Sequence, residues 1–305
     1  MLNRRILRIK AFKTIYSRGE NPAMTSKEGE TQLELSCEAA RDLYLFLMAL
    51  PEALTAEAGS RIEAARGKFN PTEEELHPNM KFAQNAVAPL LSEDPDFSRI
   101  IQKKKLSWEQ YDVFLRHLYD TLRTREYYLS YMQSELRSLK EDAALWSDIF
   151  ASELEENPEL EAILEDLGIW WNDDLVYAVN WCCRTMEDLG KGERWSLPPL
   201  YMSDLSDKAE SDKAFITKVL RTAFAHYEDY VNSIAAITPK WDRSRICSTD
   251  LALIVCGLAE NAAFPEQGAG IIINEYVEIS KFYSTPESRA FVNGILDRLI
   301  NTKKK

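Results

Sequence analysis

Apolar residues recur every three or four positions along most of this chain, whereas the strict alternation typical of β-strands is almost absent. A run between positions 215 and 234 has this helical spacing, with Phe215, Val219, Leu220, Phe224, Tyr227, Tyr230, Val231 and Ile234. A shorter run from 43 to 54 has the same period. The pattern predicts an all-α fold in which amphipathic helices bury one face each.

Capping residues predict where several helices begin and end. Asn157 before Pro158 is typical of a helix start, and Gly168 is typical of the end of that helix. The stretch Ser284-Thr285-Pro286-Glu287 predicts the start of the final helix, with its last residue as the capping acid. Asn3 is the predicted N-cap of the opening helix. The Gly- and Pro-containing stretch 190–212 reads as a linker.

The opening helix starts with positive charge, although the 305-residue chain has a formal net charge of −12. Its cations are Arg4, Arg5, Arg8, Lys10, Lys13 and Arg18. Cations at the positive end of a helix dipole cost about 0.3–1 kcal/mol each. Helix N-termini and guanidinium groups both bind phosphate well, so the cluster predicts a phosphate or RNA site. A frayed and solvated terminus is the alternative explanation.

Composition and motifs exclude several classes of protein. The five cysteines have no CxxC spacing, and the three histidines have no metal-ligand spacing. The sequence also lacks a G-x-S-x-G nucleophile motif, a P-loop and a dinucleotide-binding glycine motif. We therefore expect no catalytic residue, no metal site and no cofactor. Because no apolar run is long enough for a signal peptide or a membrane span, we expect a cytoplasmic protein without a membrane partner.

Three stretches form an ordered set of motifs. The opening one is Arg8-x-x-Ala11-x-x-x-Ile15-Tyr16, and the second is Trp241-Asp242-Arg243-x-Arg245-Ile246 followed by Asp250. The third and densest is IINEYVEISKFYSTPESRAFVNGILDRL, from Ile272 to Leu299. Together they resemble the NusB transcription antitermination family. One departure is the loop after Pro265, where the family has a proline shortly before the Ile-Asn-Glu run.

The resemblance implies two small helical bundles packed together, with a large helical insertion in this chain. It covers roughly residues 1–60 and 210–305. We therefore expect an N-terminal part at 1–66, an insertion at 67–205 and a C-terminal part at 206–305. Within the insertion, residues 141–175 contain twelve acids and no Lys or Arg. Such a run is typical of a solvated helical face, and an acidic docking surface is the alternative.

The family resemblance implies an RNA-binding role without catalysis. Members bind the boxA element of nascent ribosomal RNA together with NusE, a ribosomal small-subunit protein, and help RNA polymerase pass terminators. Some members dimerise through the face that binds RNA, so the sequence leaves it undecided whether this chain forms a homodimer. Two alternatives remain: a protein-interaction scaffold using the acidic insertion, and the NusB-like domain of some RNA methyltransferases. The absence of a nucleotide-binding glycine motif argues against the methyltransferase.

The expected RNA contacts lie at both ends of the chain. Arg4, Arg5 and Arg8 match the arginine-rich start of the family, and Lys10 is a weaker match. Phe291 matches the aromatic RNA contact and would stack on a base, with core packing as the alternative. Glu287 and Arg289 flank it, and helix capping explains Glu287 equally well.

The expected contacts to NusE are Tyr16 and Asp250. Core packing is the alternative for Tyr16. Asp250 lies in a first helical turn, where a carboxylate is also stabilised by the helix dipole. Asn274-Glu275 and Asn293-Gly294 are interpreted as structural.

Overall fold

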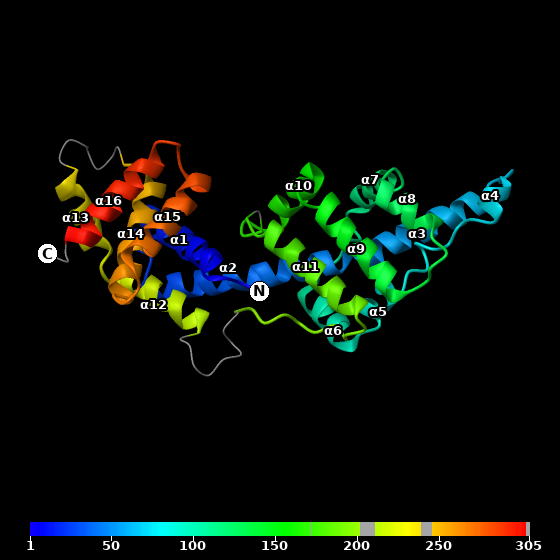
Figure 1. The fold of residues 1–305 in the computed structure, drawn as a ribbon, viewed down its shortest axis with the longest axis horizontal. Helices are drawn as coiled ribbons and strands as arrows, with labels where there is room; N and C mark the ends of the chain where they lie inside the picture. Colours follow the sequence, from blue (N-terminus) through cyan, green and yellow to red (C-terminus); the bar gives the residue numbers. More distant parts are fainter. Residues whose placement is uncertain (172, 202–210, 239–245, 303–305) are drawn as a thin grey trace. The chain divides into compact units, whose positions relative to one another are not determined.

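The computed structural model describes residues 1–171, 173–201, 211–238 and 246–302, and these ranges are built from helices (Figure 1). Their β structure is limited to one isolated parallel bridge between Leu2 and Tyr201. The all-α prediction is therefore confirmed. Of the helices described, none combines the length and the apolar character needed to cross a lipid bilayer.

Contacts within the chain divide it into two compact units. The first comprises residues Met1–Glu38 and Pro199–Lys305, and the second comprises Ala39–Pro198. The expected boundary at 66/67 lies inside the second unit, because α3 (Leu50–Arg66) packs on α5 (Val87–Ser92) and α7 (Asp112–Leu122). The other expected boundary, at 205/206, lies outside the described residues. The extent of the insertion relative to the family stays a prediction.

The first unit is arranged around one helix, α14 (Ser248–Ala263). This helix is buried on nearly every side, because its middle turns are almost entirely apolar. Its neighbours in Figure 1 are α1 (Arg4–Glu20), α12 (Asp212–Ala225), α13 (Tyr227–Ile237), α15 (Ala269–Tyr283) and α16 (Ser288–Thr302). The N-terminal part of α2 (Ser26–Met48) also belongs to this unit.

The second unit has its own aromatic core. Trp146 is fully buried, and its indole nitrogen donates a hydrogen bond to Asn85 at 3.1 Å. Phe46 stacks on Trp108 with ring centroids 4.1 Å apart. Besides α3, α5, α7 and the end of α2, its helices are α4 (Glu73–Leu76), α6 (Pro95–Lys104), α8 (Glu126–Gln133), α9 (Leu139–Glu153), α10 (Pro158–Leu167) and α11 (Leu175–Gly190).

Some predicted helix boundaries are confirmed. The carboxamide of Asn157 accepts hydrogen bonds from the backbone nitrogens of Glu159 and Leu160, at 3.1 and 3.2 Å. Helix α10 begins at Pro158 and ends before Gly168, as expected. Asn3 likewise caps α1.

Two other boundaries differ from the prediction. The periodic run 215–234 is divided at His226, whose backbone leaves the helical region at φ −117° and ψ 18°. The final helix begins at Ser288, because residues just before it form a turn in which the Ser288 nitrogen donates to the Thr285 carbonyl. Glu287 is therefore outside the helix and is not the capping acid that we expected.

Candidate nucleic-acid interface at the start of helix α1

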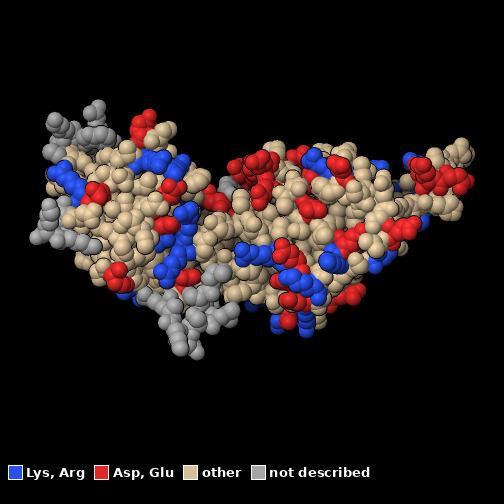
Figure 2. Space-filling model, viewed as in Figure 1, with Lys and Arg blue, Asp and Glu red and all other residues tan. Residues whose placement is uncertain are grey.

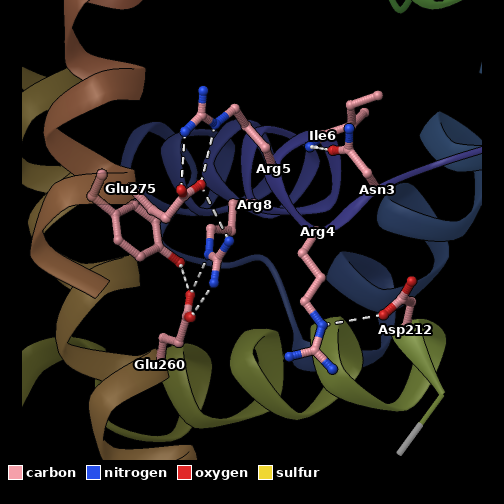
Figure 3. Close-up of polar contacts among 9 residues, drawn as sticks. Asn3, Arg4, Arg5, Ile6, Arg8, Asp212, Glu260 and Glu275 are labelled. Carbon is pink, nitrogen blue, oxygen red and sulfur yellow. Dashed lines mark hydrogen bonds and ion pairs between the residues drawn. The ribbon is translucent and has the colours of Figure 1, made fainter. Parts of the chain in front are cut away.

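The start of α1 is held in place by local and long-range hydrogen bonds. The side chain of Asn3 accepts a hydrogen bond from the Ile6 nitrogen at 3.0 Å (Figure 3). The Leu2 nitrogen donates to the Leu200 carbonyl at 2.9 Å. No acidic residue lies in the first turn of α1. At the start of α1, the positive end of the helix dipole therefore lies beside arginine side chains, with no acid of its own first turn to offset the charge.

Arg8 lies in the interior, although we expected it to contact RNA. Its side chain is only 5% exposed, and its Nε and Nη2 donate to Glu260 at 2.8 and 2.6 Å (Figure 3). Burial alone would lower the pKa of Arg8, but the hydrogen bonds and charge of Glu260 raise it overall. The expectation is corrected: Arg8 joins α1 to α14 and is not available to a ligand. Lys10 is also buried.

Arg5 is half-exposed and bound by a carboxylate of α15. Its Nε and Nη2 donate to Glu275 at 3.1 and 2.9 Å. Arg8 adds a longer bond to the same carboxylate, at 3.3 Å. The hydrogen bond from Arg5 is the main reason why the pKa of Glu275 is lowered. Arg5 therefore has an acidic partner in the free protein that an anionic ligand must displace or share.

Arg4 is as exposed as Arg5 but is bound through a single guanidinium nitrogen among the described contacts. Its side chain is 46% exposed, and it binds Asp212 through Nε alone, at 3.2 Å. Its guanidinium carbon lies 4.6 Å from the ring centroid of Phe215, which restricts the orientation of the plane. Among the described residues, none accepts a hydrogen bond from Nη1 or Nη2 of Arg4, and Figure 3 shows both turned away from Asp212. These two nitrogens form a fork of the kind that binds phosphate bidentately.

Helices α1, α15 and α16 bring charged groups together around Glu278. The pKa of the Glu278 carboxyl is lowered, first by the hydrogen bond from Lys281 and also by the charges of Arg289 and Arg5. Arg5 from α1 and Arg289 from α16 thus act on the same carboxylate of α15. Beside them lies a groove of about 560 Å³ between α15 and α16, lined in part by Asn274, Glu278, Arg289 and Asn293. Figure 2 shows basic groups over α1, with acidic groups next to them.

The predicted contacts on α16 are divided between two flanks of that helix. Arg289 lines the groove against α15. Phe291 is half-buried and does not line this groove. Residues two apart in a helix point to different sides, whereas residues four apart share one. Phe291 therefore lies on another flank of α16 than Arg289.

The two expected partner contacts differ in accessibility. Tyr16 is 37% exposed and lines a pocket of about 240 Å³ with Arg18 and Tyr227. Asp250 is buried and accepts a hydrogen bond from the Ser284 hydroxyl. Asp250 consequently joins the start of α14 to the end of α15, and the expectation that it contacts a partner directly is corrected. The Trp241–Arg245 motif lies outside the described residues.

The comparisons with known proteins were consistent with the sequence motifs. A sequence model of the NusB family matches residues 183–301. A relative from Finegoldia magna, "Transcription antitermination protein NusB", is 33% identical over 95 residues, which are 31% of this chain and 69% of the relative. The chain belongs to the NusB family.

Further NusB relatives have similar coverage. The protein from Acetivibrio thermocellus is 33% identical over 97 residues, 32% of this chain and 67% of its own length. That from Geobacter sulfurreducens is 26% identical over 115 residues, 38% and 83% respectively. No solved structure matches the chain. Helices α12 to α15 and all but the last residue of α16 lie within the family match, and α1 lies outside it.

Sequence reasoning missed two features of this NusB-family surface. One is the set of acidic partners of the opening arginines. Of these partners, Glu260 could have been predicted, because it is the one acid within the apolar run 251–260. An acid that is buried with such a run normally has a cationic partner. The other is Phe282, an exposed aromatic residue at the end of α15.

Proposed function

We propose that this chain is an RNA-binding transcription antitermination factor that acts on boxA-type sites of ribosomal RNA transcripts together with the ribosomal protein NusE. Its family membership supports antitermination, since the matched relatives bear that name. In this role it catalyses no reaction and affects RNA polymerase indirectly, through the RNA.

The observation that carries the proposal is the free fork of Arg4. Two guanidinium nitrogens without a described partner stand at a helix N-terminus that has no acid in its first turn. The Phe215 ring beneath the guanidinium limits its rotation, so less entropy is lost when a phosphate binds. A backbone phosphate placed there would receive two parallel hydrogen bonds and the favourable field of the helix dipole.

Other residues would extend the contact along the RNA. Arg5 and Arg289 are exposed cations that flank Glu278, so a second phosphate there would replace part of their carboxylate pairing. Glu287 would border the RNA, and Phe291 would offer the open part of its ring to a base on the other flank of α16. Tyr16 would contact NusE through its pocket. Arg8 would act by fixing the helix that carries Arg4 and Arg5.

A titration of the full chain with a short fluorescent boxA-like RNA, with and without a NusE protein, tests the proposal. We expect R4A/R5A to weaken binding, and to reduce the slope of log affinity against log salt by about 0.7 for each RNA phosphate that is no longer neutralised. R99A is the matched control, because Arg99 is an exposed arginine of the second unit whose partner among the described residues is Asp96 on its own helix. Equal binding by wild type, R4A/R5A and R99A would overturn the proposal.

A second candidate function is a protein-interaction scaffold. It is favoured by the acidic stretch 141–175, which also carries Ile169 with 77% of its surface exposed. Val176, just after the stretch, is 52% exposed. Apolar side chains surrounded by acids would suit a basic partner. If the chain bound no boxA-like RNA under any condition but captured a basic peptide in an I169S-sensitive manner, this candidate would replace the first.

A further inference from the structure

Phe282 is the most exposed aromatic side chain described in the first unit, with 82% of its surface accessible. A phenylalanine that is not buried contributes little to folding, so its ring is available for contact with a ligand. We propose that Phe282 is a stacking platform for an unpaired RNA base, on the surface formed by α1, α15 and α16. The inference rests on the proposed function and adds to it an aromatic contact distinct from Phe291.

The backbone that carries Phe282 is anchored to the rest of the unit. The neighbouring Tyr283 packs on Phe12 of α1, with ring centroids 5.3 Å apart. The ammonium of Lys13 lies 5.5 Å from the centroid of the same tyrosine ring. Behind it, Ser280 is fully buried and accepts through its carbonyl a 3.0 Å bond from the Ser284 nitrogen. The exposed ring therefore stands on a fixed helix end, which lowers the entropy lost when a base stacks on it.

Phe282 shares one face of α15 with the carboxylates that hold the surface cations. Glu275, Glu278 and Phe282 are spaced by three and four residues, so they form a single stripe along the helix. At 1.5 Å rise per residue, Phe282 lies about 6 Å beyond Glu278 and about 10 Å beyond Glu275 along the axis. Glu275 forms an ion pair with Arg5, and Glu278 forms one with Lys281. The positive charge of Arg289 also acts on Glu278. A strand whose phosphates take over these cations would bring a base to Phe282.

The surroundings of Phe282 favour a nucleic-acid base over a protein side chain. A single aromatic ring among lysines and arginines is the usual arrangement of single-stranded nucleic-acid sites, where the base stacks and its phosphate meets a cation. The centre of a protein interface is instead a contiguous apolar patch. Ile271, the other exposed apolar residue of this stripe, lies three helical turns away, about 16 Å along the axis. Along this stripe of α15, the residues between Ile271 and Phe282 are thus the charged Glu275 and Glu278.

The test compares F282A and F282L with wild type in titrations of the full chain with a boxA-like RNA. We expect F282A to lower the affinity about fivefold or more. F282L should be nearly as weak, because leucine keeps the apolar volume but has no π-face. The salt dependence should be unchanged, since no phosphate contact is removed. F69A is the matched control, because Phe69 is fully exposed in the second unit, and we expect it to bind as wild type does.

The outcomes separate this inference from the proposed function. If wild type binds and R4A/R5A weakens binding while F282A does not, the stacking platform alone is overturned. If F282L keeps the affinity that F282A loses, or if F282A affects only binding of the NusE protein, Phe282 is a protein contact and the inference fails. If wild type does not bind the RNA, the proposed function fails first. Circular dichroism of F282A should match wild type, because the removed ring is exposed.

Discussion

Arg8 of α1 and Glu260 of α14 form an ion pair in the interior of the first unit. Two hydrogen bonds of 2.8 and 2.6 Å join them, and the Tyr276 hydroxyl donates a third bond to Glu260 at 2.9 Å. Burial and the nearby Glu260 raise the pKa of Tyr276 well above its ordinary value, so this hydroxyl stays a donor. The charges are therefore compensated and their hydrogen bonds satisfied, the condition under which a buried pair is tolerated.

Replacing Glu260 by glutamine should destabilise the protein by about 3–5 kcal/mol, because the buried Arg8 would lose the carboxylate that binds it most closely and would keep only the longer contact to Glu275 at 3.3 Å. The double variant R8M/E260L should recover much of this loss, since it removes both charges together. Urea unfolding followed by circular dichroism measures both effects. R5A is the control: its half-exposed pair with Glu275 should cost less than about 1 kcal/mol. Equal losses in E260Q and R5A would contradict the assignment.

Stability should depend on pH through Glu275. Hydrogen bonding to Arg5 lowers the pKa of Glu275 below its ordinary value of 4.5, so the unfolded chain binds its proton more readily than the folded one. The stability that Glu275 contributes is therefore complete above 4.5 and is lost as the pH falls through the lowered pKa. In E275Q this part of the acid sensitivity should disappear. Urea unfolding of both proteins across the acid range measures it, and parallel curves would count against the pairing.

Gly257 and Gly294 should respond in opposite ways to alanine. A Cβ at Gly257 would lie 2.7 Å from Leu296 Cδ2 and 3.3 Å from Tyr276 Cδ2, because α14 approaches α15 and α16 closely there. G257A should therefore destabilise by about 1–3 kcal/mol. A Cβ at Gly294 would meet nothing within 4 Å, so G294A should stabilise by about 0.4–1 kcal/mol. Unfolding midpoints measure both, and a G257A protein as stable as wild type would contradict this packing.

Helix boundaries were predicted correctly from the sequence where residues next to each other determine the backbone conformation. Asn157, Pro158 and Gly168 bound α10 because a cap, a proline and a glycine act on their own turn. The break at His226 was not predicted, since apolar spacing continues from Phe224 through Tyr227 without a proline or glycine. Only packing in three dimensions distinguishes one long helix from two short ones at such a place.

The candidate site was harder to predict, because its charges are balanced by residues far along the chain. Arg4, Arg5 and Arg8 look equivalent in the sequence. Their partners Asp212, Glu275 and Glu260 come from three other helices, and they leave one guanidinium enclosed and two half-exposed. Periodicity places a residue on a helix face, but it does not tell which acid lies opposite it.

The geometry of Arg4 leads to a prediction that separates charge from shape. In R4K the positive charge remains, so the salt dependence of RNA binding should stay close to that of wild type. The affinity should still fall about fivefold, because a lysine ammonium cannot make the two parallel bonds that Nη1 and Nη2 offer to a phosphate. In R4A both the affinity and the salt dependence should decrease. Fluorescence anisotropy of a labelled boxA-like RNA at several salt concentrations measures the two quantities together. An R4K protein that binds as tightly as wild type would show that Arg4 acts only as a point charge, and that its stacking on Phe215 has no part in RNA recognition.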